Sequence, residues 1–394
     1  MTIDILIIGQ GLAGTHLAHQ CLTAGLKTLI LDQNHHQAAS KIAAGMINPI
    51  KGKRLALLWD NESDYEESMA HYARLETQLN STFLRPLDMV RLIDSEDTIA
   101  YYHKKLKNPQ TARFLQNPLS PKDLPECHPY PLSLKIPGVQ QLDTHHFLNE
   151  SRRYFTAQNS LQNTRFNPED LELLPNGVRY QDIQAKFIVF CEGHQATQNP
   201  FWKHLPFENA LGTVLTLTAP GLKPNTIYNN GKWLCPLPNG DYKLGTTSHW
   251  DIEGTLRHFD RLSTPQAQGP MPELGESVPE PLNRSPKRSL NLQDAEPVEV
   301  SKDKEHTQKL PIPKKDITTL EDRLTTMLKT SYHIKHSEAG IRPVLKDRAP
   351  IATFHPEHPQ IGIINGLGGH GCFYAPILAE SLVKQIQGTL NQPH

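Results

Sequence analysis

The stretch IDILIIGQGLAG, Ile3–Gly14, decides the fold of this chain. Its first six residues form a nearly all-apolar run, which is typical of a strand buried on both faces of a parallel sheet. Three glycines follow at once in a G-x-G-x-x-G spacing, and apolar residues then recur at helical spacing over about 12–23. A second apolar strand, Thr28–Leu31, ends on the acid Asp32. This order of strand, glycine turn, helix and strand predicts an α/β fold.

The glycine turn has the features that a dinucleotide requires. Gly9 permits the tight turn out of the strand, Gly11 lets a pyrophosphate approach the backbone, and Gly14 lets the helix pack close to the sheet. The helix N-terminus directs free N–H groups and the positive end of its dipole at the phosphates. Asp32 is placed to accept hydrogen bonds from a ribose hydroxyl. We therefore predict a dinucleotide site; the alternative is a plain glycine turn in another α/β fold.

Composition narrows the class of protein. The 394 residues suffice for two domains, and 40 basic against 41 acidic residues argue against a dedicated nucleic-acid binder. No apolar run approaches the length of a membrane span, and the N-terminus leads directly into the first strand, without room for a signal peptide. The five cysteines contain no C-x-x-C pair. We expect a cytoplasmic protein without disulfides.

Histidines are numerous, and three groups of them suggest metal ligands. These are His35–His36, His145–His146 and the pair His355 and His358. None of these groups has a ligand spacing on a supporting helix. We therefore predict solvated or packing histidines and no metal site.

The middle of the chain changes from helix-rich to sheet-rich. After a run of small residues at 38–49 comes the basic loop 50–54, which is either a solvated turn or a contact for an anion. We predict helices over 62–80 and 144–157, mixed structure over 81–137 with proline-rich turns at 118–137, and a short strand at 139–142. Further predicted strands lie at 160–167, 171–174, 177–180, 186–193, 213–217, 232–236 and 241–247, with Asn239–Gly240 as a hairpin turn.

Residues 255–312 differ from the rest of the chain. Prolines recur among Ser, Glu, Lys and Gln, and no aromatic residue occurs between Phe259 and Tyr332. Such a segment cannot bury enough apolar surface to offset its ordering entropy. We predict a disordered insertion without chemistry; docking of a partner protein is the alternative. A helix over about 316–328 follows.

A second glycine-rich turn lies near the C-terminus. The buried strand 361–365 leads into Gly366–Gly371, and a helix is predicted over about 374–386. Gly340-Ile341-Arg342-Pro343 precedes this unit. The fold should direct both glycine turns at the same ligand.

These segments together resemble the D-amino-acid oxidase/glycine oxidase family of flavin amine oxidases. The matches are 9–14 with Asp32, 38–49, 187–193, 240–247, 340–343 with Asp347, and 366–376, in the family's order. Glu192 departs from the family, which usually has a small residue there. The resemblance implies FAD and a discontinuous Rossmann-like α/β domain over 1–48, 138–195 and 336–394. It also implies an α+β substrate domain with an antiparallel sheet over 49–137 and 196–335.

The resemblance also implies a set of site residues. Arg342 falls at the family's substrate-carboxylate arginine, and a guanidinium grips a carboxylate with paired donors. Its alternative role is a surface or domain-interface ion pair. Trp233 falls near the aromatic residue that covers the substrate, and Tyr242 and His249 are weaker candidates. The His370 side chain is a separate catalytic candidate, with structural packing as its alternative. The implied cofactor contacts are Gly9, Gly11, Leu12, Ala13, Gly14, Asp32, Gln33, Ser40, Ala43, Ala44, Gly45, Met46, Gly193, Gly368, Gly369, His370 and Gly371.

The implied activity is oxidation of a small amine or amino acid by hydride transfer to flavin N5, with O2 as the electron acceptor. Orientation does most of the work in such a reaction, and no protein acid or base is required. The N–H groups at 369–371 would stabilise the negative charge of the reduced flavin. Alternatives are a dehydrogenase of this fold that uses a quinone or carrier protein, a non-catalytic flavin-binding partner protein, and an oxidase of a modified tRNA base.

Overall fold

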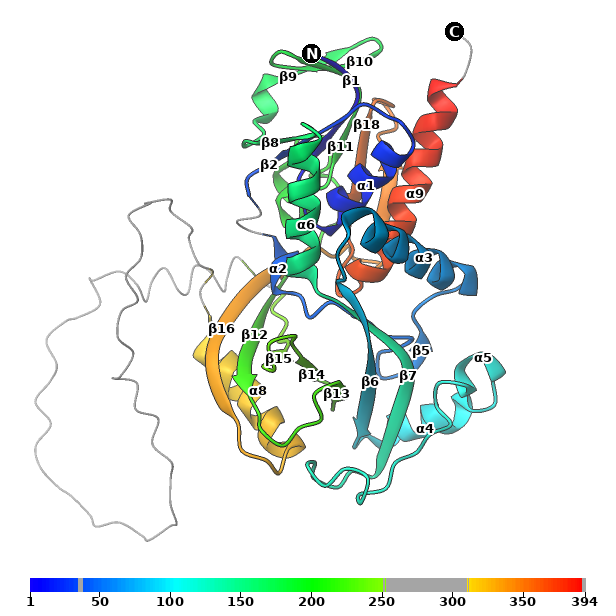
Figure 1. Ribbon diagram of the computed structural model, residues 1–394, viewed down its shortest axis with the longest axis vertical. Helices are drawn as coiled ribbons and strands as arrows, with labels where there is room; N and C mark the ends of the chain where they lie inside the picture. Colours follow the sequence, from blue (N-terminus) through cyan, green and yellow to red (C-terminus); the bar gives the residue numbers. More distant parts are fainter. Residues whose placement is uncertain (35–37, 251, 253–309, 311, 392–394) are drawn as a thin grey trace, which may run out of the picture. The chain divides into compact units, whose positions relative to one another are not determined.

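The computed structural model describes residues 1–34, 38–250, 252, 310 and 312–391. Two eight-stranded sheets carry this part of the fold (Figure 1). Nearly all of the predicted insertion at 255–312 lies outside the described residues, as do His35 and His36. Its last described residues, Leu310 and Ile312, pack against a small apolar cluster that contains Leu211.

The first sheet is mainly parallel, as predicted. β1 lies between β2 and β11, and β8 and β18 extend this parallel core outward. β17 closes one edge in the antiparallel sense, and the hairpin of β9 and β10 pairs with β11. The strands are β1 Thr2–Ile8, β2 Thr28–Asp32, β8 Leu161–Asn163, β9 Leu171–Leu174, β10 Gly177–Tyr180, β11 Ile183–Phe190, β17 Ile351–Phe354 and β18 Ile361–Asn365.

Both faces of this sheet are buried, which explains the apolar run of β1. Ile5 and Ile7 pack on one side against α1 Leu12–Thr23, α6 Thr144–Ala157 and α9 Gly371–Leu390. Leu6 and Ile8 pack on the other side with the β9–β10 hairpin and Trp202. Figure 1 shows α1 and α9 side by side on their face of the sheet.

The second sheet is antiparallel except for one parallel pair, β6 with β13. Helix α8, Lys314–Met327, covers part of one face through Leu320 and Leu324. In spatial order the strands are β16 His333–Arg342, β12 Ala210–Thr218, β15 Tyr242–Gly245, β14 Trp233–Pro236, β13 Thr226–Asn229, β6 Leu84–Ile93, β7 Leu132–Leu142 and β3 Met46–Ile47.

The short strand predicted at 139–142 is the end of β7, Leu132–Leu142. The stretch 81–137, predicted as mixed structure with proline-rich turns at 118–137, contains β6 and the first part of β7, and these two long strands pair. Their register shifts between Leu87 and Met89, and Pro137 and Gly138 lie opposite that point, the glycine at φ +74°. A bulge tolerates residues that normally interrupt a ladder, so the proline did not end the strand.

The other elements are short or connect the sheets. The helices predicted at 12–23 and 144–157 are confirmed with those bounds. The strand predicted at 160–167 is shorter, and the last helix is longer than predicted at both ends, since it begins at Gly371 and ends at Leu390. The remaining elements are α2 Ala39–Ile42, β4 Ile50–Lys51, β5 Ala56–Leu57, α3 Glu62–Leu79, α4 Glu96–Lys105, α5 Pro109–Ala112, η1 Pro168–Asp170 and η2 Gly193–Gln198.

The division into cofactor and substrate domains stays a prediction. Strand pairing places Met46–Ile47, 138–142 and 336–342 with the second sheet, although the sequence analysis assigned them to the cofactor domain. Among the described residues, no helix is long and apolar enough to span a membrane.

Candidate functional site

The turn between β1 and α1 is compact because its glycines touch backbone. A Cβ at Gly14 would lie 1.8 Å from the Gly9 carbonyl oxygen. A Cβ at Gly9, whose φ is +96°, would lie 2.6 Å from the Cys191 carbonyl oxygen at the end of β11. Gly11 meets only the Ser40 Oγ, at 3.5 Å, so its outer side is open. Only glycine allows the close approaches at positions 9 and 14, and the open side of Gly11 leaves backbone accessible to a ligand.

The N-termini of α1 and α9 meet at this turn. Each helix begins without a side-chain cap and without an acid in its first turn. A Cβ at Gly371 would lie 3.3 Å from the Leu12 Cδ1, so the two first turns are in contact. Gly366 and Gly368 adopt positive φ and shape the approach to α9. Two uncapped helix N-termini side by side favour an anionic or electron-rich ligand.

Asp32 is tied to both the turn and α6. Its Oδ2 accepts from the Gln10 backbone N–H at 2.9 Å, and its Oδ1 pairs with Arg152 Nη1 at 2.8 Å. Arg152 also donates to the Gln10 side-chain oxygen at 2.8 Å. The acid and the arginine are 10% and 16% exposed, so this pair is screened only weakly. Arg152 lies 120 positions from Asp32, and no sequence signal pointed to it.

The run of small residues lies beside this turn. Ser40 Oγ accepts a hydrogen bond from the Leu12 N–H at 3.3 Å. A Cβ at Gly45, whose φ is +72°, would lie 1.8 Å from the Leu142 carbonyl oxygen, so a glycine is required there for the chain to pass close to β7. Ala44 is buried, whereas Gln33 and Ala43 are exposed. On the opposite side, the Gly193 carbonyl oxygen accepts from the Asn365 side chain at 2.9 Å.

The second sheet carries Arg342 and Trp233 on one face. Arg342 Nη2 donates to the Ser248 Oγ at 2.8 Å and to the Thr247 carbonyl oxygen at 3.2 Å. A Cβ at Gly212 would lie 3.3 Å from that nitrogen, and a Cβ at Gly245 would lie 2.5 Å from the Trp233 ring. The two glycines therefore keep this face free for the arginine and the indole.

Tyr242 lies on the other face. It is 4% exposed in the core beneath α8 and donates to the Lys223 carbonyl oxygen at 3.2 Å. Burial raises its pKa from the ordinary value. The strand alternation of β15 puts Tyr242 and Gly245 on opposite faces. The structure thus puts Trp233 and Arg342 on one face of the sheet and Tyr242 on the other.

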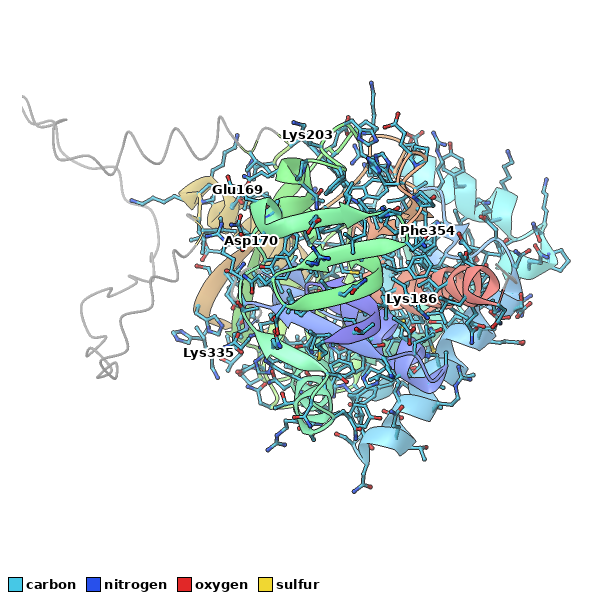
Figure 2. The ribbon with its side chains drawn as sticks, turned by 90° about the horizontal axis from the view of Figure 1, so that it is seen from above. Glu169, Asp170, Lys186, Lys203, Lys335 and Phe354 are labelled. Atoms are coloured by element: carbon cyan, nitrogen blue, oxygen red, sulfur yellow. The ribbon has the colours of Figure 1, made fainter. Side chains whose placement is uncertain are left out.

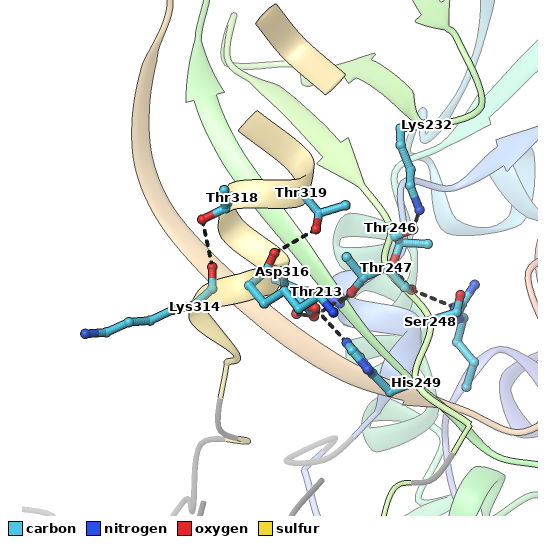
Figure 3. A network of polar contacts seen from close by, with 12 residues as sticks. Thr213, Lys232, Thr246, Thr247, Ser248, His249, Lys314, Asp316, Thr318 and Thr319 are labelled. Atoms are coloured by element: carbon cyan, nitrogen blue, oxygen red, sulfur yellow. Dashed lines mark hydrogen bonds and ion pairs between the residues drawn. The ribbon is translucent and has the colours of Figure 1, made fainter. Parts of the chain in front are cut away.

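His249 belongs to a buried network that the sequence analysis missed (Figure 3). Its Nε2 lies 2.6 Å from Asp316 Oδ1, and the hydroxyls of Thr213 and Thr247 each donate to Asp316 Oδ2 at 2.6 Å. Burial opposes ionisation of Asp316, but these hydrogen bonds outweigh it and lower its pKa. The network anchors the segment whose Thr247 and Ser248 oxygens hold Arg342.

Arg342 itself has no carboxylate partner among the described residues. Its Nε is buried without a hydrogen-bond partner, and burial lowers its pKa from the ordinary value. Lys232 is a second cation nearby and donates to the Thr246 carbonyl oxygen. Burial first, then Arg323 and Arg342, lower the pKa of this lysine. A positive group with an unused buried donor is suited to bind an anion.

Comparison with known proteins agrees with this geometry. A family model described as FAD dependent oxidoreductase (DAO) matches residues 4–385. The chain belongs to this family of FAD-dependent oxidoreductases.

Solved structures show the same fold at low identity. Iminodiacetate oxidase from Chelativorans sp. BNC1 is 16% identical, with a TM-score of 0.68 and coverage of 98% of this chain and 95% of that one. Glycine oxidase from Geobacillus kaustophilus is 15% identical, with a TM-score of 0.67 and the same coverage, 98% and 95%. L-alpha-glycerophosphate oxidase from Mycoplasma pneumoniae is 17% identical, with a TM-score of 0.66 and coverage of 98% and 95%.

The residues present in this FAD-dependent oxidoreductase fit the cofactor. The open side of Gly11 and the uncapped start of α1 suit a pyrophosphate, and Asp32 suits a ribose. A Cβ at Gly369 would meet nothing within 4 Å, so the backbone before α9 is also open to a ligand.

Two titratable side chains of the oxidoreductase flank the site. Burial, and secondarily Lys51, lower the pKa of His370 to about 4, so its imidazole is neutral at physiological pH. Burial raises the pKa of Glu192 to about 7, although a hydrogen bond from Asn199 at 2.8 Å opposes the shift. Glu192 follows β11 next to the Cys191 carbonyl, beside the first glycine turn.

Proposed function

We propose that this FAD-dependent oxidoreductase oxidises a small amine or amino acid, and that Arg342 binds the substrate carboxylate. The main support is the buried Nε of Arg342, which has no partner within the described ranges while Nη2 is held in place. A substrate carboxylate would accept from this unused donor. Such a contact fixes the substrate with paired, charge-assisted hydrogen bonds.

Trp233 forms the apolar wall of the proposed substrate site. Its ring lies over Gly245, on the face of the sheet that carries Arg342. A carboxylate held at one end and an indole against the side chain would leave a substrate few orientations. Orientation of this kind is worth several kcal/mol of activation free energy in general, on the order of 7–11 in the best cases.

The cofactor contacts follow from the glycine turns. We assign Gly9–Gly14 and Ser40 to the pyrophosphate, Asp32 to the ribose, and 368–371 to the flavin end. When bound, FAD supplies the hydride acceptor. The N–H groups at the start of α9 would stabilise negative charge placed against them, and the neutral His370 adds no competing charge.

The amine must reach the site without its extra proton, since a free lone pair assists departure of hydride. No acid or base of this chain is needed for that step. We infer that the substrate binds with its amine uncharged. The shape of the site and the contact of Arg342 with the substrate carboxylate hold it in place.

The test uses substrate pairs that differ only in the carboxylate. Under anaerobic conditions we expect glycine, sarcosine, proline or D-alanine to bleach the flavin absorbance. The decarboxylated partner of the active compound, such as pyrrolidine for proline, should react far more slowly. Arg342→Ala should remove this preference, with a loss of about 100-fold for the acid, or roughly 3 kcal/mol. Arg348→Ala, which loses an exposed ion pair with Glu208, is the control.

Two outcomes would contradict the proposal. Bleaching by none of the four compounds would discard a simple amino-acid substrate. An unchanged preference in Arg342→Ala would leave the arginine in a structural role. Arg342→Lys separates charge from geometry, because a lysine keeps the charge but loses the paired donors.

The electron acceptor is proposed to be O2. The alternative is a dehydrogenase that transfers electrons to a quinone or a carrier protein. Oxygen consumption with stoichiometric peroxide supports the oxidase, whereas turnover with an artificial dye and not with oxygen supports the dehydrogenase.

A further inference from the structure

Three potential metal ligands gather at the turn between β17 and β18, and a fourth lies near them. The donor atoms of His355, Glu357 and His358 all lie within 4.8 Å of one another. The rings of His355 and His358 stack, with centroids 5.0 Å apart at 24°. His204, from a different segment, has its ring centroid 6.1 Å from that of His355. In Figure 2 the labelled Phe354 and Lys203 mark the two chain segments.

The turn is held in place before any ligand binds. His355 N–H donates to the Ile361 carbonyl oxygen at 2.8 Å, and Ile361 N–H donates to the His358 carbonyl oxygen at 2.8 Å. Pro356 and Pro359 restrict the backbone between these bonds. The ring of His355 rests against the buried Trp202, with centroids 5.4 Å apart. A metal ion would therefore meet a largely preformed site.

The side chains are accessible to solvent. His355 and His358 are half-buried, whereas Glu357 and His204 are exposed. The Glu357 N–H donates to His355 Nδ1 at 3.2 Å, a long hydrogen bond that coordination would replace or redirect. Losing one such bond costs about 1 kcal/mol, which is small beside coordination by two imidazoles and a carboxylate.

We propose that His355, Glu357 and His358 bind one divalent transition-metal ion, with Zn²⁺ favoured and His204 as a fourth ligand. Ligand atoms about 2.1 Å from one Zn²⁺ in tetrahedral geometry lie roughly 3.4 Å apart, so the observed cluster needs only a small contraction. Imidazole and carboxylate suit Zn²⁺, and Cu²⁺ or Ni²⁺ would compete for the same ligands. Mg²⁺ and Ca²⁺ prefer sites made of oxygen alone.

The site would be structural and not part of the oxidation. The turn precedes β18, whereas the cofactor turn follows the other end of that strand. A bound ion would link the β17–β18 turn to the segment around Trp202 and His204. The spacing of these histidines along the chain predicts solvated or packing residues, and it does not reveal that His204 lies beside His355.

The experiment titrates the FAD-loaded protein, freed of metals with a chelator, with Zn²⁺ against a chromophoric indicator. We expect one equivalent bound with a Kd of about 10 μM or tighter. His355→Ala/His358→Ala should weaken binding at least 100-fold, and His204→Ala about 10-fold. His333→Ala/His336→Ala removes two exposed histidines of β16 near Glu338 and should bind Zn²⁺ as the parent does.

Two readouts separate a lost site from a damaged fold. The flavin absorbance and the metal-free Tm of the double variant should match those of the parent, and His355→Gln/His358→Gln serves if the alanine variant is unstable. Zn²⁺ should raise the Tm of the parent and of the β16 control, but not that of either turn variant. Co²⁺ bound in place of Zn²⁺ should give a visible absorption spectrum that is typical of nitrogen ligands. Equal weakening in the β16 control, or unchanged stoichiometry in both turn variants, would overturn the proposal.

Discussion

The two sides of the candidate site are built in opposite ways. On the cofactor side, Gly9, Gly11 and Gly14 lie within six residues, and the tightest approach is between two of them, Gly14 and the Gly9 carbonyl oxygen. On the proposed substrate side, Gly212, Trp233, Gly245 and Arg342 come from four strands and meet only through sheet pairing. A substitution within the glycine turn should therefore disrupt the cofactor side directly. The substrate side should also respond to substitutions in residues that lie far away along the chain but hold its strands and side chains in place.

Gly14→Ala should have the largest effect. Its Cβ would lie 1.8 Å from the Gly9 carbonyl oxygen, so α1 must move away from the turn. We expect loss of bound FAD and a Tm lower by well over 5 °C, measured by flavin absorbance and calorimetry. Gly388→Ala in α9 is the matched control, since its Cβ meets nothing and should stabilise the helix by about 0.5–1 kcal/mol. Full FAD occupancy in Gly14→Ala would refute the local-motif argument.

Asp316→Asn should weaken only the proposed substrate side, which carries Arg342. The 2–3% exposed carboxylate accepts from His249 and two threonines, and an amide cannot accept all three bonds. We expect a loss of about 3 kcal/mol in the free energy of unfolding in urea, and weaker substrate binding because Ser248 no longer holds Arg342. FAD content should not change. Asp322→Asn, at an exposed position of the same helix, should behave as the parent protein.

Mild acid should destabilise the cofactor side. His71 Nε2 lies 2.9 Å from His16 Nδ1, whose other nitrogen lies 3.2 Å from the Tyr72 hydroxyl. Burial, then Arg74, lower the pKa of His71 to about 4, so the folded state binds fewer protons than the unfolded state between pH 6.5 and 4. Stability should therefore fall by about 2–3 kcal/mol across that window.

The control for the acid effect is another histidine. His71→Gln should reduce the dependence of the urea midpoint on pH without abolishing it, because burial also lowers the pKa of His16 and of His19. His103→Gln, at an exposed position of α4, should keep the full dependence. Equal slopes in the parent protein and His71→Gln would show that other groups control acid stability.

Arg152→Ala should have the smallest effect. It frees the Asp32 carboxylate from a 2.8 Å ion pair but leaves the glycine turn intact. We expect FAD to bind the apoprotein about 10-fold more weakly, which corresponds to roughly 1.4 kcal/mol, measured by flavin fluorescence. Arg153→Ala removes a neighbouring exposed arginine paired with Glu150 and should leave the Kd for FAD unchanged. An unchanged Kd for FAD in Arg152→Ala would show that the Arg152–Asp32 ion pair does not contribute to FAD binding.

Much of the fold could be predicted because its signals are local. The first βαβ unit, α6 and the hairpin around Asn239–Gly240 follow from periodicity and turn residues within a short window. The first part of β7 was missed because its bulge tolerates Pro137 and Gly138, which in isolation indicate a turn. Tyr242 was placed among the site candidates because residue type alone does not say which face of a strand is buried against α8.

The sequence by itself determined the glycine turns, the acid after β2 and the resemblance to flavin oxidases, because these depend on neighbours along the chain. Only the tertiary structure decided that Arg152 meets Asp32, that Asp316 holds the segment under Arg342, and that His204 joins His355. Such contacts join residues tens to more than a hundred positions apart. They arise from sheet pairing and helix packing, which no short window of sequence records.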